Sequence, residues 1–113
     1  GITVPIVPGI LCLTSCSAFL RMTAMCQTRL PEGMQEAAQQ AGKESEEVFK
    51  AWTIKFLVDM CQQLLESGAP GFHFYTLNLE QVVVGTLLGL EMITAEQAAA
   101  CIGDADARSM MSP

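Results

Sequence analysis

Two short β-rich runs, TVPIVP at residues 3–8 and FHFYT at residues 72–76, limit the fold of this chain more than any other feature. The first run is apolar on both faces and ends at Pro8, which is typical of a buried parallel strand. Pro5 must then lie at a bulge or where its nitrogen needs no ladder partner. Between the runs, apolar residues recur at three- and four-residue steps, which predicts helices. The order is strand, helices, strand, helix, or two βα units joined by a helical crossover.

A sheet of two parallel strands is too small to cover these helices. It leaves both edges and most of both faces of the sheet open, so the sequence predicts a piece of a larger α/β domain. A complete eight-stranded barrel needs about 250 residues, whereas this chain has 113.

Three helices are expected between the two runs. Thr14 or Ser15 can cap the first, whose apolar positions are Phe19, Leu20, Met22, Met25 and Cys26. The second is short, with Pro31 in its first turn and Gly42 at its end. Ser45 opens the third and longest, which ends at Ser67-Gly68.

Two further helical segments are expected after residue 76. Asn78 can cap a helix over LEQVVVGTLLGL, and Thr94 can cap one weak helical turn in the following segment. Beyond these, residues 104–113 read as a polar tail. The predicted division is a folded segment at residues 1–92 and a C-terminal tail at residues 93–113.

The composition argues against nucleic-acid and membrane partners. Six basic and twelve acidic residues give a formal charge of -6, which repels a phosphate backbone. No apolar run reaches the roughly 20 residues needed to span a bilayer. The apolar start of the chain has no basic flank and is broken by prolines, so we predict no secretory segment.

The five cysteines are odd in number and scattered, which favours a reducing cytoplasm over a disulfide framework. With His73 as the only histidine, the spacing for a zinc site is missing. Cys12 and Cys16 have no base or cation nearby in sequence, so burial is the expectation for both. We also expect His73 to be a packed strand residue, because no acidic partner lies near it in sequence.

The motifs VPIVPGIL at the start, RLP at residues 29–31 and HFYTLN at residues 73–78 resemble those of methylenetetrahydrofolate reductases. The likeness covers roughly residues 1–92. It implies the last two βα units of a (β/α)8 TIM barrel, with residues 3–8 as the seventh strand and residues 72–77 as the eighth. Pro8 to Leu13 and Thr76 to Leu79 would then lie at the catalytic face.

The resemblance also implies site residues. Tyr75 matches a tyrosine that contacts the folate substrate, and Leu77, Leu79 and Met22 lie at positions expected to bind substrate. Leu79 stands where family members carry an arginine that binds folate. Ala18 and Met22 stand where bacterial members carry a glutamine and a phenylalanine. No catalytic residue and no metal ligand is expected in this segment.

The activity that the resemblance implies is the FAD-dependent reduction of 5,10-methylenetetrahydrofolate to 5-methyltetrahydrofolate with NADH or NADPH. Most FAD-holding groups of the family come from the first six strands. The segment is therefore expected to form one wall of the folate and nicotinamide site and to be inactive alone. Its partners would be the rest of the barrel and the folate, in a homo-oligomeric enzyme.

A non-catalytic module for protein interaction is the alternative. The apolar stripe from Trp52 to Leu65 can bind a partner as well as it can cover a barrel. The strands decide between the two hypotheses. Adjacent parallel strands favour the barrel segment, whereas helical or distant segments favour the interaction module.

Overall fold

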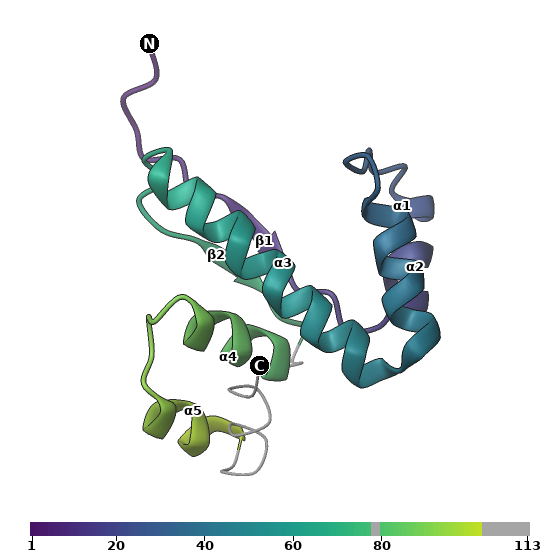
Figure 1. Ribbon diagram of the computed structural model, residues 1–113. Helices are drawn as coiled ribbons and strands as arrows, with labels where there is room; N and C mark the ends of the chain where they lie inside the picture. The colour runs from purple at the N-terminus through teal and green to yellow at the C-terminus, as the bar shows by residue number, and fades with distance from the viewer. Residues whose placement is uncertain (78–79, 103–113) are drawn as a thin grey trace. The chain divides into compact units, whose positions relative to one another are not determined.

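The computed structural model describes residues 1–77 and 80–102, and it divides the chain into two units (Figure 1). Residues 1–12 and 54 onward form the first unit, and residues 13–53 form the second. The longest helix, α3 (Glu46–Glu66), contributes its first turns to the second unit and the rest to the first.

The first unit contains a parallel pair of strands, β1 (Gly9–Leu11) and β2 (His73–Tyr75). Gly9 pairs with His73, Ile10 with Phe74 and Leu11 with Tyr75. The parallel pairing confirms the crossover that the sequence predicts. The interaction module was favoured only if the two segments were helical or far apart, and the paired strands are neither.

The first strand lies later in the chain than predicted. Residues 3–8 are not in a strand, and the ladder begins at Gly9. Prolines 5 and 8 have no N–H group to donate, so the segment that contains them cannot sustain a ladder. The Pro8 carbonyl is the first group to join it, accepting a hydrogen bond from the His73 N–H at 2.9 Å.

One face of this sheet is buried against helices and the other is exposed. Ile10 is buried in one face with Cys12, against Leu57 and Cys61 of α3 and Val82 of α4 (Glu80–Gly89). Phe74 packs against the same cluster. The other face carries Gly9, Leu11, His73 and Tyr75, all of which are exposed. Alternation along each strand therefore places one set of side chains in the core and the other in the open.

The last described helix is α5 (Ala95–Ile102), which is longer than the single weak turn predicted. The Thr94 hydroxyl accepts a hydrogen bond from the Gln97 N–H at 3.2 Å, and the Gln97 side chain accepts one from the Thr94 N–H at 2.8 Å. This reciprocal pair is a capping box. Ala98 packs against Val84 of α4 in a small core of their own.

Asn78, the predicted cap of α4, lies outside the described residues. The division at residue 92 stays a prediction.

The second unit consists of α1 (Cys16–Met25), α2 (Met34–Glu44) and the beginning of α3. Its core is Phe19, Ala38, Ala41 and Phe49. Ser15 caps α1, as predicted, with its Oγ accepting from the Ala18 N–H at 3.2 Å.

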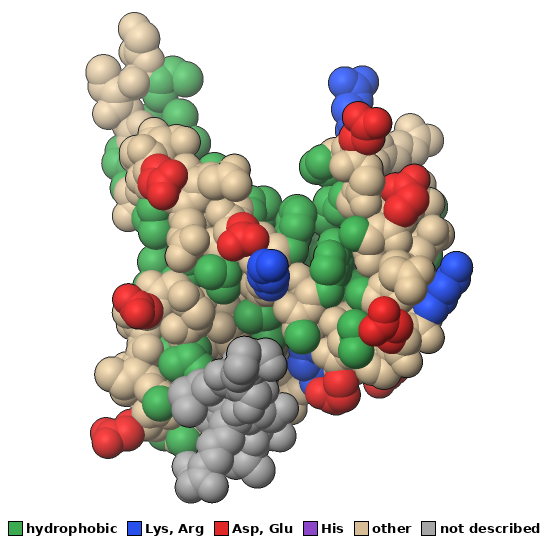
Figure 2. Space-filling view, viewed as in Figure 1, with side chains coloured by type: hydrophobic (Ala, Val, Ile, Leu, Met, Phe, Trp, Pro, Cys, Tyr) green, Lys and Arg blue, Asp and Glu red, His purple; other side chains and the backbone are tan. Residues whose placement is uncertain are grey.

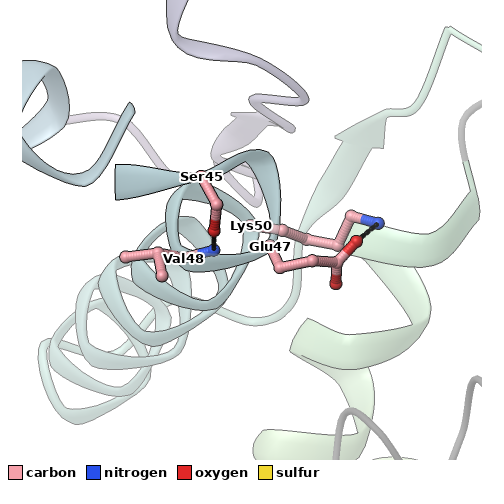
Figure 3. Close-up of polar contacts among 4 residues, drawn as sticks. All are labelled: Ser45, Glu47, Val48 and Lys50. Carbon is pink, nitrogen blue, oxygen red and sulfur yellow. Dashed lines mark hydrogen bonds and ion pairs between the residues drawn. The ribbon is translucent and has the colours of Figure 1, made fainter. Parts of the chain in front are cut away.

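Ser45 opens α3 as the sequence predicts. Its Oγ accepts a hydrogen bond from the Val48 N–H at 3.1 Å, and an ion pair joins Glu47 and Lys50 at 3.9 Å in the next turn (Figure 3). The cap satisfies one of the unpaired N–H groups at the start of the helix.

α2 differs from the prediction at both ends. It begins at Met34 after Gly33, so Pro31 precedes the helix and does not lie in its first turn. Gly42 does not end α2, which continues to Glu44. A Cβ atom at Gly42 would lie 2.6 Å from the Cβ of Cys16 in α1. The glycine is therefore explained by the close approach of two helices and not by a helix end.

Charged and apolar groups both reach the surface. On the face drawn in Figure 2, acidic side chains are scattered and do not form one patch. Ile2, Val4, Ile6 and Val7 of the N-terminal segment are exposed. Within residues 1–77 and 80–102, no helix is long and apolar enough to cross a membrane.

Candidate functional site

The carboxyl ends of β1 and β2 define the candidate site, because parallel α/β folds bind ligands at these ends of their strands. The strands end at Leu11 and Tyr75, and the Cys12 N–H donates to the Tyr75 carbonyl at 3.4 Å. The segment Pro8 to Leu13 was predicted to lie at the catalytic face, but this is wrong for most of it. Pro8 precedes β1 and residues 9–11 form the strand, so the segment reaches the strand end only at Cys12.

Tyr75 is the last residue of β2 and its side chain is 52% exposed on the open face of the sheet. Its ring lies 4.7 Å from the His73 ring, centre to centre, at an interplanar angle of 59°. Gly9 lies under the ring on the neighbouring strand. The site therefore presents an aromatic surface to the solvent, which suits contact with a flat ring.

Leu77 follows the strand end and is 64% exposed, with a backbone φ of 51°. A branched apolar residue rarely adopts this left-handed conformation, and it costs roughly 1–3 kcal/mol. Residues held in such conformations cluster at functional sites. Leu79, the third predicted substrate-binding position, lies outside the described residues.

Met22 belongs to the other unit. It lies in α1, is half-buried, and follows Ala18 by one turn. Of the predicted substrate-binding residues, Tyr75 and Leu77 are thus brought together at one strand end, while the placing of Met22 beside them stays a prediction.

His73 is exposed, so the prediction that it is a packed strand residue is wrong. It alternates with Phe74, which takes the buried face, and therefore shares the open face with Tyr75. The sequence alone does not say which face of a two-stranded segment its neighbours cover.

Cys12 and Cys61 are the buried thiols of this unit, with Cys12 directly at the strand end. Burial raises the pKa of Cys12, and the nearby Cys61 raises it further. Burial also raises the pKa of Cys61. Both thiols are therefore neutral and inert at neutral pH, as structural cysteines are.

The described residues of the first unit do not form a site for the pyrophosphate of a dinucleotide cofactor. Such a site needs cationic side chains or a glycine-rich turn at a helix start. Among these described residues, Lys55 is the one lysine or arginine, and it is exposed on α3. A gathering of three or more possible metal ligands is also missing from residues 1–77 and 80–102.

The second unit has a separate hollow of about 490 Å³, where the start of α1 faces the end of α2 and the start of α3. Ser15, Cys16, Lys43 and Glu46 are among its lining residues. Lys43 and Glu46 bring opposite charges, and no buried unpaired polar group points to a particular ligand there.

The fold and the strand-end site define a helix-rich α/β segment of the class that binds ligands at the ends of parallel strands. Comparison with known proteins makes this class specific. Residues 1–89 match the family model described as methylenetetrahydrofolate reductase. The chain belongs to this family, which confirms the resemblance seen in its motifs.

Similar curated proteins come from plants and yeast. A probable methylenetetrahydrofolate reductase (NADH) of Oryza sativa subsp. japonica is 42% identical over 93 residues, and methylenetetrahydrofolate reductase (NADH) 1 of Arabidopsis thaliana is 39% identical over 93 residues. Each alignment covers 82% of this chain and 16% of the relative. Methylenetetrahydrofolate reductase 2 of Saccharomyces cerevisiae is 34% identical over 97 residues, covering 85% of this chain and 16% of the relative. The chain thus spans about one sixth of the length of these relatives.

Gly9 lies within the predicted catalytic-face segment, Pro8 to Leu13, but it was expected in the turn after the strand. Its contact with the Tyr75 ring was not predicted, because the strand was placed at residues 3–8 and Gly9 in fact begins β1.

Proposed function

We propose that this chain forms the last two βα units of a (β/α)8 barrel that reduces 5,10-methylenetetrahydrofolate to 5-methyltetrahydrofolate. The reductant is NADH or NADPH and the complete enzyme carries FAD. The observation that carries the proposal is the parallel pairing of β1 with β2, which brings Tyr75 of the HFYTLN motif to a strand end.

In this proposal the open face of the sheet lines the barrel interior, and Tyr75 offers its ring to the flat bicyclic ring of the folate. Leu77 adds an apolar contact beside the ring. Met22 is proposed as a further substrate contact on the strength of the family resemblance alone. Leu79 replaces the arginine of other family members, so the folate carboxylates lose a bidentate partner at this position.

The 113-residue chain alone is proposed to be inactive. FAD supplies the hydride chemistry when bound, but the described residues offer it neither a phosphate loop nor a cluster of cations. The remaining strands of the barrel would provide both the cofactor site and the missing walls. We place the enzyme in the cytoplasm, as a homo-oligomer, on the strength of the family resemblance.

The test uses the complete reading frame that contains this segment. The purified product is expected to carry flavin absorbance and to reduce methylenetetrahydrofolate with a nicotinamide cofactor. Tyr75→Ala is expected to raise the folate KM about tenfold, which corresponds to the loss of one aromatic contact.

The matched control is Phe72→Leu, which alters an aromatic residue that precedes β2 and packs in the buried cluster. It should leave the folate KM unchanged even if it lowers stability. Flavin bound by the 113-residue chain alone, or a full-length product without folate reduction, would overturn the proposal.

A further inference from the structure

The ring of Tyr75 lies directly against the backbone of Gly9. A Cβ atom built on Gly9 would lie 2.6 Å from Cε2 of Tyr75, 3.4 Å from its Cζ and 3.3 Å from its hydroxyl oxygen. Real Cβ atoms do not approach ring carbons this closely. The position of the ring therefore requires that residue 9 has no side chain.

Backbone conformation gives no other reason for a glycine here. Among the described residues, the glycines with positive φ are Gly33 and Gly68, and Gly9 is not one of them. Any residue can adopt the backbone of Gly9, so space for the Tyr75 ring is what the glycine provides.

The direction of the ring follows from the register. Tyr75 pairs with Leu11, whereas Gly9 pairs with His73, so the ring leans diagonally across β1 toward the earlier pair. The His73 ring also lies close, with the two ring centres 4.7 Å apart. The Tyr75 ring therefore contacts both the bare backbone of Gly9 and the imidazole of His73.

We propose that Gly9 and His73 are positioning residues that set the orientation of the Tyr75 ring and thereby the affinity of the site for the folate ring. This rests on the proposed function, in which Tyr75 contacts folate. A side chain at position 9 displaces the ring, and loss of the imidazole at position 73 frees it.

The experiment compares Gly9→Ala with Gly71→Ala in the full-length protein. Gly71 has no atom within 4 Å of the place where a Cβ would stand and is not among the positive-φ glycines. Gly9→Ala is expected to raise the folate KM roughly five- to tenfold, close to the effect of Tyr75→Ala. Gly71→Ala is expected to have the folate KM of the unmodified protein.

The melting temperature and the flavin content of the full-length Gly9→Ala protein separate positioning from general damage. Both should stay close to those of the unmodified protein, because the added methyl group meets only the exposed ring of Tyr75. In the double variant Gly9→Ala/Tyr75→Ala, the folate KM should equal that of Tyr75→Ala alone, because there is no ring left to displace. If the two substitutions instead raise the folate KM by independent factors that multiply in the double variant, the proposal is wrong.

His73→Ala gives a second test that does not depend on how Gly9→Ala folds. With 3-fluorotyrosine placed at position 75, its ¹⁹F signal should shift or broaden in His73→Ala, and the folate KM should rise. An unchanged signal and KM would overturn the positioning role. If Tyr75→Ala itself leaves the folate KM unchanged, the proposed function of Tyr75 fails, and not merely its positioning.

Discussion

Thr53 carries a fully buried hydroxyl group with no hydrogen-bond partner. A buried polar group without a partner costs roughly 1–3 kcal/mol. Replacing Thr53 with valine, which has the same shape, is therefore expected to raise the free energy of unfolding by about 1 kcal/mol. Urea unfolding of the two proteins measures the difference.

Thr86 is the matched control for this substitution. It is equally buried, but its hydroxyl donates to the Val82 carbonyl at 2.8 Å. Thr86→Val removes a bond that exists and is expected to lower stability by about 0.5–1.5 kcal/mol. Equal effects of the two substitutions would contradict the difference between the two hydroxyls.

Buried and exposed cysteines should differ in reactivity. Cys12 and Cys61 are buried with raised pKa values, whereas Cys26 and Cys101 are exposed. Alkylation at pH 8 is expected to modify the exposed pair at least about tenfold faster, since the thiolate is the reactive form. Mass spectrometry of the labelled peptides measures the order, and early labelling of Cys12 would contradict it.

The same thiols make stability depend on pH in a defined direction. Folding favours the protonated thiol, because burial raises its pKa. The contribution of this thiol to the free energy of unfolding is therefore complete below the ordinary thiol pKa of 9.0. It is lost as the pH rises through the raised pKa of the folded state. Stability should therefore fall above pH 9, and less steeply in Cys12→Ala.

At the residue scale, the sequence predicts Tyr75 as a substrate contact, and the structure places it at the end of β2, but the surroundings of Tyr75 were not predicted. The HFYTLN motif is local in the chain, so it can be recognised without a structure. The contact with Gly9 and the exposure of His73 depend on which strand lies alongside and at what register, and neither is written in a short motif.

Among the elements, α1 and α2 depend on Gly42. Alanine in place of a helical glycine ordinarily stabilises by about 1 kcal/mol. Here the added Cβ would stand 2.6 Å from the Cβ of Cys16 and 2.9 Å from its Sγ. Gly42→Ala is therefore expected to destabilise the protein by about 1–3 kcal/mol, because the helices must move apart.

Gln40→Ala, at an exposed position of the same helix, is the control and should leave the protein at least as stable. Thermal unfolding followed by circular dichroism compares the variants. A stabilised Gly42→Ala protein would show that the two helices can separate at no cost.

Three helix starts were predicted correctly from sequence. Ser15, Ser45 and Thr94 each cap the helix expected of them, because capping is a local interaction over three residues. Strand limits and both ends of α2 were missed. β1 is displaced by two prolines, and Gly42 serves a contact with another helix, which no local pattern reveals.

The chain exposes apolar side chains near its start and carries a sheet of two strands. Ile2, Val4, Ile6 and Val7 are exposed, and the two-stranded sheet has open edges. Open edges and contiguous apolar surface promote association. We expect the 113-residue chain to bind a hydrophobic dye and to self-associate, as measured by analytical ultracentrifugation.

The variant Val4→Lys/Ile6→Lys should reduce both dye binding and association, because it adds charge to this segment. The matched control, Lys55→Arg on the exposed side of α3, keeps its charge and should leave both unchanged. A chain that stays monomeric at high concentration and binds no dye would contradict the exposure of these residues.

At the scale of the whole molecule, the sequence predicted the order of elements and the parallel crossover, and the structure confirms both. That the sheet is part of a larger one stays a prediction, made because two strands cannot cover this many helices. The protein family was recognised from sequence motifs and not from packing. Neither motifs nor packing patterns in the sequence predicted which face of the sheet is buried.

The pairing of β1 with β2 also has a consequence for how the chain acquires its structure. Three helices separate the two strands in the chain, so no ladder bond can form until all of them have been synthesised. Closing so long a loop is entropically costly and slow, while each helix forms locally and fast. We expect the helices to form first and the pairing of the two strands to limit the folding rate. The apolar segment at residues 2–7 and β1 would then stay unpaired during synthesis until β2 has been made.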